Sequence, residues 1–243
     1  MAEIDRRTSL ALGGALLPAL LIGACKASSD AREHENAQAG GDEQPVTANE
    51  DLMREHGVLR RILIVYREAA PKIAANPAQV DAAALATAAN LFRTFGEQYH
   101  EEKLEEQHIF PAVAKAGGAA ANLVDTLKAQ HKRGREITDF ILDQTRAGRI
   151  ATGQAEAVAR AMLGFTRMYE AHAAREDTIV FPAFKAAMGQ QHYDELGEKF
   201  EEIERQQFGG DGFDMAVDKV AGVEQALGLG DLAIFTAPPL ARG

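Results

Sequence analysis

The sequence is short of cysteine and of basic charge, and each shortage excludes a class of protein. A single Cys among 243 residues rules out an intramolecular disulfide framework, a cysteine-based zinc finger and an iron–sulfur cluster. The formal net charge of −10 makes the chain a poor partner for nucleic acid. A hydrophobic content of 46% excludes a wholly disordered chain. Any bound metal must therefore use carboxylates and some of the seven His residues.

The N-terminal region contains an apolar run that is too short to cross a membrane as a helix. Residues 10–24 carry no charge and follow a polar segment that contains Arg6 and Arg7. Fifteen residues at about 1.5 Å each fall short of a hydrocarbon core about 30 Å thick. We therefore predict a signal peptide over residues 1–24.

Two features of this region indicate the kind of signal. The only cysteine, Cys25, follows the apolar run directly in a sequence that resembles a bacterial lipobox. The paired arginines resemble a twin-arginine export signal. We expect an exported protein in the periplasm or cell envelope, attached to the membrane by a lipid anchor at Cys25. An ordinary secretory signal with an incidental Cys is the alternative.

From residue 49 onwards, apolar residues recur at helical spacing and turn signals are few. Asn49 is expected to cap the first helix and Pro71 to end it. Because short connections favour antiparallel neighbours, we predict an all-α fold with an up-down-up-down four-helix bundle over residues 49–190. The predicted helices span residues 49–70, 79–116, 120–147 and 152–189.

Segments of different character flank the predicted bundle. Residues 26–48 contain no aromatic residue, no Leu and no Ile, so we expect a flexible linker. Residues 191–243 are predicted to form a C-terminal helical extension and tail, with helices over residues 193–207 and 214–227. This extension holds no recognisable chemistry, and its role stays open.

A histidine lies on the apolar face of each of the four predicted helices. These residues are His56, His100, His131 and His172. Glu176 lies four residues after His172 on the same face. Burying an unpaired carboxylate is costly, and no inward Lys or Arg is evident at a matching depth. A bound cation would compensate this charge, so the pattern predicts a metal site that the four His residues share.

Residues 99–113 and 172–184 are also similar to each other, since each contains a His, an acidic pair, a short apolar run and Phe-Pro. Together with the inward histidines of the first and third helices, this constellation resembles the hemerythrin-like family of HHE cation-binding domains over residues 49–190. The resemblance implies a bundle that encloses two iron ions, held by His side chains and bridged by two carboxylates. The residues that match the family pattern are His56, His100, His131, His172 and Glu176.

The second bridging carboxylate is less plainly marked. The family pattern is His-x-x-x-Glu, but the second helix has Leu104 at that offset from His100. Counted back from Phe-Pro, Glu105 aligns with Glu176. A straight helix would place His100 and Glu105 about 140° apart, and a one-residue π-bulge would bring them onto one face. We predict Glu105 as the bridge. The carboxylates that could replace or join it are Glu101 and Glu106.

The sequence departs from oxygen-carrying hemerythrins, which have a second His on the third helix, four residues after the first. Arg135 occupies that position here, preceded by Gly134. Fewer imidazoles leave positions for water or an exogenous ligand. We therefore expect a small diatomic or oxidant ligand, O₂, NO or peroxide, or a role in sensing or holding iron. Whether the chain is an enzyme stays open.

Two other functions stay open. A ferritin-type di-iron oxidase or ferroxidase takes a Glu-x-x-His pair from each of two helices. The pairs here, Glu97 with His100 and Glu105 with His108, both lie on the second helix. A structural envelope lipoprotein without metal would need hydrogen bonds for every inward His. Ligand type alone also permits zinc or manganese.

Overall fold

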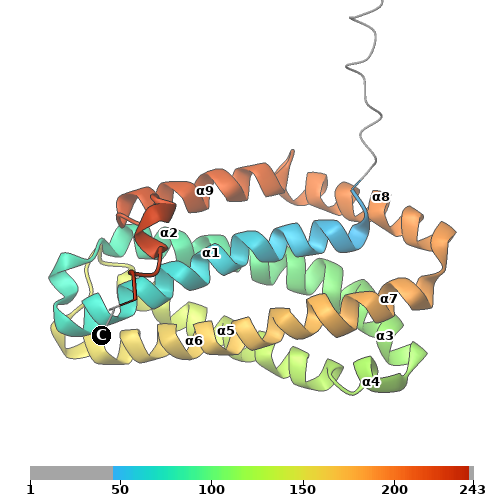
Figure 1. Ribbon diagram of the computed structural model, residues 1–243, viewed down its shortest axis with the longest axis horizontal. Helices are drawn as coiled ribbons and strands as arrows, with labels where there is room; N and C mark the ends of the chain where they lie inside the picture. Colours follow the sequence, from blue (N-terminus) through green and yellow to red (C-terminus); the bar gives the residue numbers. More distant parts are fainter. Residues whose placement is uncertain (1–45, 241–243) are drawn as a thin grey trace, which may run out of the picture. The chain divides into compact units, whose positions relative to one another are not determined.

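The computed structural model describes residues 46–240, and those residues form helices and loops with no strand (Figure 1). The all-α prediction is confirmed over this range. None of the described helices is both long and apolar enough to cross a membrane. The predicted signal peptide, Cys25 and all but the last three residues of the predicted linker lie outside the described residues.

The predicted helices are divided into more segments than the sequence pattern indicates. The first predicted helix is α1, and the second is a continuous run of α2, η2 and α3. The third corresponds to α4 and α5, and the fourth to α6, η4 and α7. Two further helices, α8 and α9, follow them. The bounds are α1 Ala48–Ala75, α2 Ala82–Leu91, η2 Phe92–Ile109, α3 Phe110–Ala116, α4 Gly118–Ala121, α5 Val124–Thr145, α6 Ala155–Arg175, η4 Glu176–Val180, α7 Phe181–Met188, α8 Gln190–Phe208 and α9 Gly212–Ala226. Short 3₁₀ turns lie at Pro77–Gln79, Thr152–Gln154 and Leu232–Phe235.

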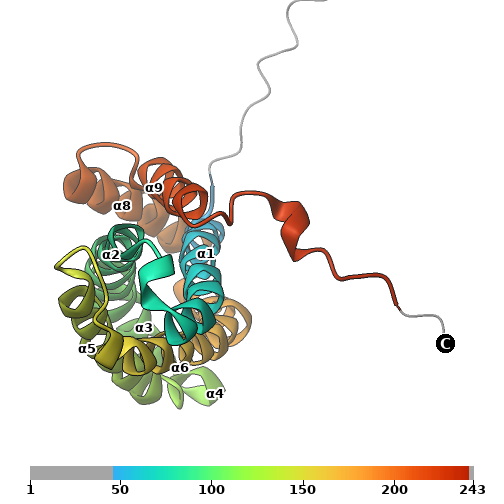
Figure 2. The same ribbon diagram turned by 90° about the vertical axis from the view of Figure 1, so that its left-hand side faces the viewer.

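The long helices surround one apolar core. Viewed end-on, α1, α2, α5 and α6 lie around a common centre (Figure 2). Each contacts its neighbours: α1 packs on α6, α6 on α5, and α5 on α2, while η2 packs on α1. Large side chains with no more than 1% exposure fill the centre, among them Tyr66, Phe92, Phe95 and Phe165. Close packing of this kind holds the polar residues between the helices in defined positions.

The first helix differs from its prediction at both ends. Its N-cap is Thr47 rather than Asn49, and Thr47 forms a capping box with Glu50. Asn49 instead donates its Nδ2 to the Phe181 carbonyl at 2.9 Å. Pro71 lies inside the helix and does not end it. The helix continues because Ile73 is fully buried, and this burial offsets the hydrogen bond that proline removes.

The C-terminal helices pack against the long helices and do not stand apart. The structure places α8 against α1, α7 and η2, and α9 against α1 and α2. Phe200 of α8 and Val220 of α9 are buried at these contacts. The bounds lie within three residues of the predicted ones.

The contact between α1 and α8 gives the stability of the chain a pH dependence. Burial raises the pKa of Asp51 to about 7, and the nearby Glu55 carboxylate contributes to this rise. Burial also raises the pKa of Glu204 to about 7. In the unfolded chain the pKa of each of these acids is about 4. Between these values the folded state binds more protons, so the free energy of unfolding falls as pH rises.

We expect Asp51→Asn to reduce this fall between pH 5 and pH 8 by about 1 kcal/mol, since asparagine has no proton to lose. Urea unfolding of wild type and variant at the two pH values measures the difference. Glu202→Gln on the exposed face of α8 is the control and should behave as wild type. Equal pH dependence in wild type and Asp51→Asn would contradict the assignment.

Candidate metal centre

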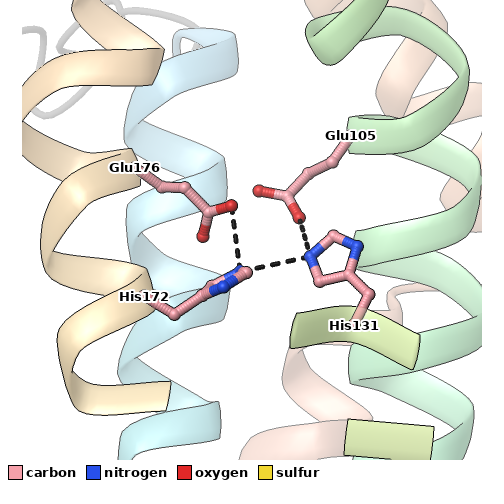
Figure 3. Close-up of side chains that lie close together, drawn as sticks. All are labelled: Glu105, His131, His172 and Glu176. Atoms are coloured by element: carbon pink, nitrogen blue, oxygen red, sulfur yellow. Dashed lines mark hydrogen bonds and ion pairs between the residues drawn. The ribbon is translucent and has the colours of Figure 1, made fainter. Parts of the chain in front are cut away.

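The six predicted site residues meet in the centre of the long helices. Four segments far apart in sequence contribute them, and each residue is at most 3% exposed. Figure 3 shows four of the side chains pointing towards one another. The residues and their elements are His56 of α1, His100 and Glu105 of η2, His131 of α5, His172 of α6 and Glu176 of η4.

The π-helical geometry of η2 brings His100 and Glu105 together. A π-helix has i→i+5 hydrogen bonds, so residues five apart lie on one face. The Phe110 amide donates to the Glu105 carbonyl in this pattern. In place of the predicted one-residue π-bulge, the structure has a π-helix of 18 residues. The second π-helix, η4, was not predicted; there the Phe181 amide donates to the Glu176 carbonyl.

The imidazoles form two pairs. The Nε2 atoms of His56 and His100 are 3.0 Å apart, and those of His131 and His172 are 3.1 Å apart. Two nitrogens bound at about 2.1 Å to one ion, at a right angle, are also about 3.0 Å apart. The spacing of each pair therefore fits two neighbouring ligands of one metal ion.

The carboxylates each face both imidazole pairs. One oxygen of Glu105 lies 3.5 Å from the Nε2 of His100, and the other lies 3.3 Å from the Nε2 of His131. The oxygens of Glu176 lie 3.5 Å from the Nε2 of His56 and 3.0 Å from that of His172. All four oxygens are buried without a hydrogen-bond partner. This arrangement gives each imidazole pair one oxygen from each carboxylate.

Each imidazole is oriented by an acceptor on its outer nitrogen. The Nδ1 of His100 lies 2.5 Å from Glu55, and that of His56 lies 2.7 Å from Asp177. An acceptor on this side favours a proton on Nδ1, which leaves Nε2 as the nitrogen that can bind a metal ion. The other two pairs are His131 with Glu106 and His172 with Gln130, both at 2.9 Å. We did not identify these outer partners from the sequence, because they come from other helices or from helix faces next to the predicted stripe.

The donor set therefore fits cations. The inward atoms are imidazole nitrogens and carboxylate oxygens, all of which can bind a metal ion once they are deprotonated. Burying these carboxylates away from water is unfavourable unless their negative charge is compensated. Two ions, one at each imidazole pair, would satisfy all four nitrogens and all four oxygens. Imidazole and carboxylate together suit iron, and also zinc or manganese.

Without a cation, the groups of the cluster shift one another's protonation. Burial raises the pKa of Glu176 well above its usual range, and the nearby Glu105 raises it further. The pKa of Glu105 is well below its usual range, because His100 and His131 outweigh the opposing effect of burial. Burial opposes protonation of His131, but neighbouring carboxylates raise its pKa to about 10. Burial and the charge of His131 lower the pKa of His172 to about 4.

Glu101 and Glu106, which the sequence left open as ligands, have other partners in this structure. The Tyr169 hydroxyl donates to Glu101 at 2.6 Å, and Arg135 donates to Glu101 at 3.2 Å. Arg135 also donates to Glu106 at 2.7 Å. Arg135 thus neutralises two carboxylates beside the cluster, at the position where oxygen carriers have a second His. Glu105 is the carboxylate of η2 that faces both imidazole pairs.

Gly134 provides the space that Tyr169 occupies. A Cβ at position 134 would lie 2.0 Å from the Tyr169 hydroxyl oxygen, far inside normal contact. We expect Gly134→Ala to break the Tyr169–Glu101 hydrogen bond and to destabilise the fold by about 1–3 kcal/mol. Gly164→Ala on α6 is the control, because nothing lies within 4 Å of its added Cβ. It should stabilise by up to about 1 kcal/mol. Equal effects of both substitutions, measured by urea unfolding, would contradict this role of Gly134.

A small cavity adjoins the cluster between α1, η2 and α6. Its volume is about 20 Å³, which exceeds the roughly 10–15 Å³ needed for one water molecule. Leu59, Leu63 and Phe92 form its apolar wall, and Tyr169 also lines it. The cluster contributes His56, His100, Glu105, His172 and Glu176. One small molecule could therefore lie next to the imidazoles and carboxylates.

The fold and the cluster define an all-α protein with a buried site that could hold cations, and comparison with known proteins identifies its family. Residues 47–184, and in an overlapping second match residues 122–227, match the hemerythrin HHE cation binding domain. The chain belongs to this family.

The relatives cover almost the whole chain. Uncharacterized protein Rv1995 of Mycobacterium tuberculosis and uncharacterized protein Mb2018 of Mycobacterium bovis are each 40% identical over 237 residues. The similarity covers 97% of this chain and 92% of each relative. No solved structure matches the chain significantly.

Proposed function

We propose that this chain is a non-haem di-iron protein of the hemerythrin type, built as an up-down-up-down four-helix bundle. His56 and His100 would hold one ion, His131 and His172 would hold the other, and Glu105 and Glu176 would supply carboxylate ligands to both. The observation that carries the proposal is the pairing of the four Nε2 atoms around two shared carboxylates. The family match supports cation binding.

The ligand in this proposal is a small diatomic molecule or oxidant, namely O₂, NO or peroxide. When bound, the iron supplies open coordination positions and a change of oxidation state. The buried side chains around the site exclude water. Glu55 and Asp177 fix the orientation of the His100 and His56 imidazoles. The small cavity lined by the cluster suits a ligand of a few atoms. A role in sensing or holding iron uses the same residues.

The proposed location is the cell envelope. It rests on the apolar run of residues 10–24 and on Cys25, which together resemble a lipoprotein signal. In this proposal the lipid at Cys25 anchors the chain to the membrane, and the linker separates the metal centre from the lipid surface.

The ferritin-type alternative receives no support from the geometry. His108 lies against Phe200, with ring centroids 5.8 Å apart. Glu97 is paired with Arg93 at 2.9 Å. Among residues 46–240, neither belongs to a cluster that could hold a metal. The alternative without metal would leave two carboxyl groups fully buried, with only the neighbouring imidazoles to compensate their charge.

Metal analysis with an optical spectrum tests the proposal. We expect about two irons per purified chain and near-ultraviolet absorption from the bridged pair. His172→Ala should lose both, because His172 is buried at the site. His192→Ala, at an exposed residue of α8, should retain them. A metal-free chain that folds normally and does not respond to His172→Ala would leave only the structural alternative.

A further inference from the structure

The cavity beside the metal centre has one wall residue that reaches solvent. The Arg60 side chain is 40% exposed. Each of the other eleven lining residues is at most 7% exposed. Arg60 lies on α1 one residue after Leu59, which is part of the apolar wall. Among the residues that line the cavity, Arg60 is therefore the one that a molecule entering from solvent would meet first.

Arg60 is held in place by an ion pair between two elements. Its guanidinium pairs with the carboxylate of Asp177 on η4. The other oxygen of Asp177 lies 2.7 Å from the Nδ1 of His56. The pair joins α1 to η4 beside the cavity. An exposed arginine has many rotamers, so breaking this pair lets the side chain swing into water without disturbing the packed core.

We propose that Arg60 is the gate of the ligand cavity: the ion pair with Asp177 closes it, and rotation of Arg60 into solvent admits a small inorganic molecule. This inference rests on the proposed di-iron function and adds the route by which its ligand enters. A gate slows entry and exit equally. Removing it should raise both rate constants and leave the equilibrium dissociation constant nearly unchanged.

The chain offers a matched control. Arg67 lies two turns further along α1 and pairs with Glu170 of α6, so it is also an ion pair from α1 to the neighbouring segment. Its side chain is 49% exposed, similar to that of Arg60. Arg67 does not line the cavity beside the cluster. Arg67→Ala removes a comparable pair and opens no route to the site.

The experiment measures NO binding to the reduced, iron-loaded chain by anaerobic stopped-flow absorption. NO is neutral, so its equilibrium binding does not respond directly to the lost charge. In Arg60→Ala we expect association and dissociation rate constants to rise together by about fivefold or more. The dissociation constant should stay within about twofold of wild type. Arg60→Lys should remain close to wild type, and Arg67→Ala should match it.

Several outcomes would overturn the gate. Rate constants in Arg60→Ala equal to those in Arg67→Ala would show that entry does not depend on Arg60. A changed dissociation constant with an unchanged association rate would assign Arg60 to ligand contact. Loss of iron in Arg60→Ala but not in Arg67→Ala would show instead that Arg60 holds Asp177 in position beside His56. A wild-type chain without iron would instead overturn the proposed function, and the gate with it.

Discussion

Glu105→Gln is expected to remove both metal ions from the chain, and not only one. Each oxygen of Glu105 faces a different imidazole pair, at 3.5 and 3.3 Å. Glutamine has no negative charge and presents only one carbonyl oxygen. Both ions therefore lose an anionic ligand at once. We expect the iron content, measured by elemental analysis of the purified chain, to fall at least about tenfold.

Glu106→Gln is the matched control for this substitution. Glu106 is the next residue of η2, but its carboxylate accepts from the outer nitrogen of His131 and from Arg135. Such outer partners affect metal affinity by about 10- to 100-fold and do not abolish binding when metal is in excess. The chain should therefore retain two irons when purified with added iron. Two irons in Glu105→Gln under the same conditions would refute the bridging role.

Removal of the metal is expected to lower the melting temperature of the chain by about 10 °C. Ions present at about 1,000 times their dissociation constant stabilise a fold by about 4 kcal/mol. For a domain of this size, each kcal/mol corresponds to about 2–4 °C. We expect this stabilisation because bound cations would compensate the charge of the buried Glu105 and Glu176 carboxylates. Thermal unfolding before and after treatment with a reductant and a chelator measures it.

Glu176→Gln is expected to have different effects on the metal-free chain and on the iron-loaded chain. In the metal-free chain, burial and Glu105 raise the pKa of Glu176 well above its usual range, which favours the neutral form of its carboxyl group. Replacement by neutral glutamine should leave the melting temperature of the metal-free chain unchanged or higher. The same variant should show no rise when iron is added. An iron-dependent rise equal to that of wild type would contradict a ligand role for Glu176.

Local patterns in the sequence predicted the helical class and several residues of the cluster. His56 and His131 lie on apolar stripes, and helix periodicity alone directs them inwards. The four-residue spacing of His172 and Glu176 puts both on one face in any regular helix. The burial of all four residues agrees with these predictions. Their role as metal ligands stays a prediction.

Other predictions were wrong because tertiary packing overrode a local signal. Pro71 ordinarily ends a helix, yet α1 continues because Ile73 is buried against the core. Asn49 is a good N-cap residue, but its side chain bonds to the Phe181 carbonyl, far away in sequence. Neither Ile73 nor Phe181 could be assigned as a partner without the arrangement of the helices.

The sequence by itself determined the helical class, the absence of cysteine-based metal sites and the inward histidines, because composition and periodicity act within one helix. The sequence favoured Glu105 among the carboxylates of the second helix but left Glu101 and Glu106 open, and the structure shows that the π-helical geometry of η2 turns Glu105 towards the histidines. Only the tertiary structure decided the outer partners of the imidazoles and the position of Arg60 at the cavity. Those contacts join helices that are distant in sequence, and no local pattern specifies how distant helices pack against one another.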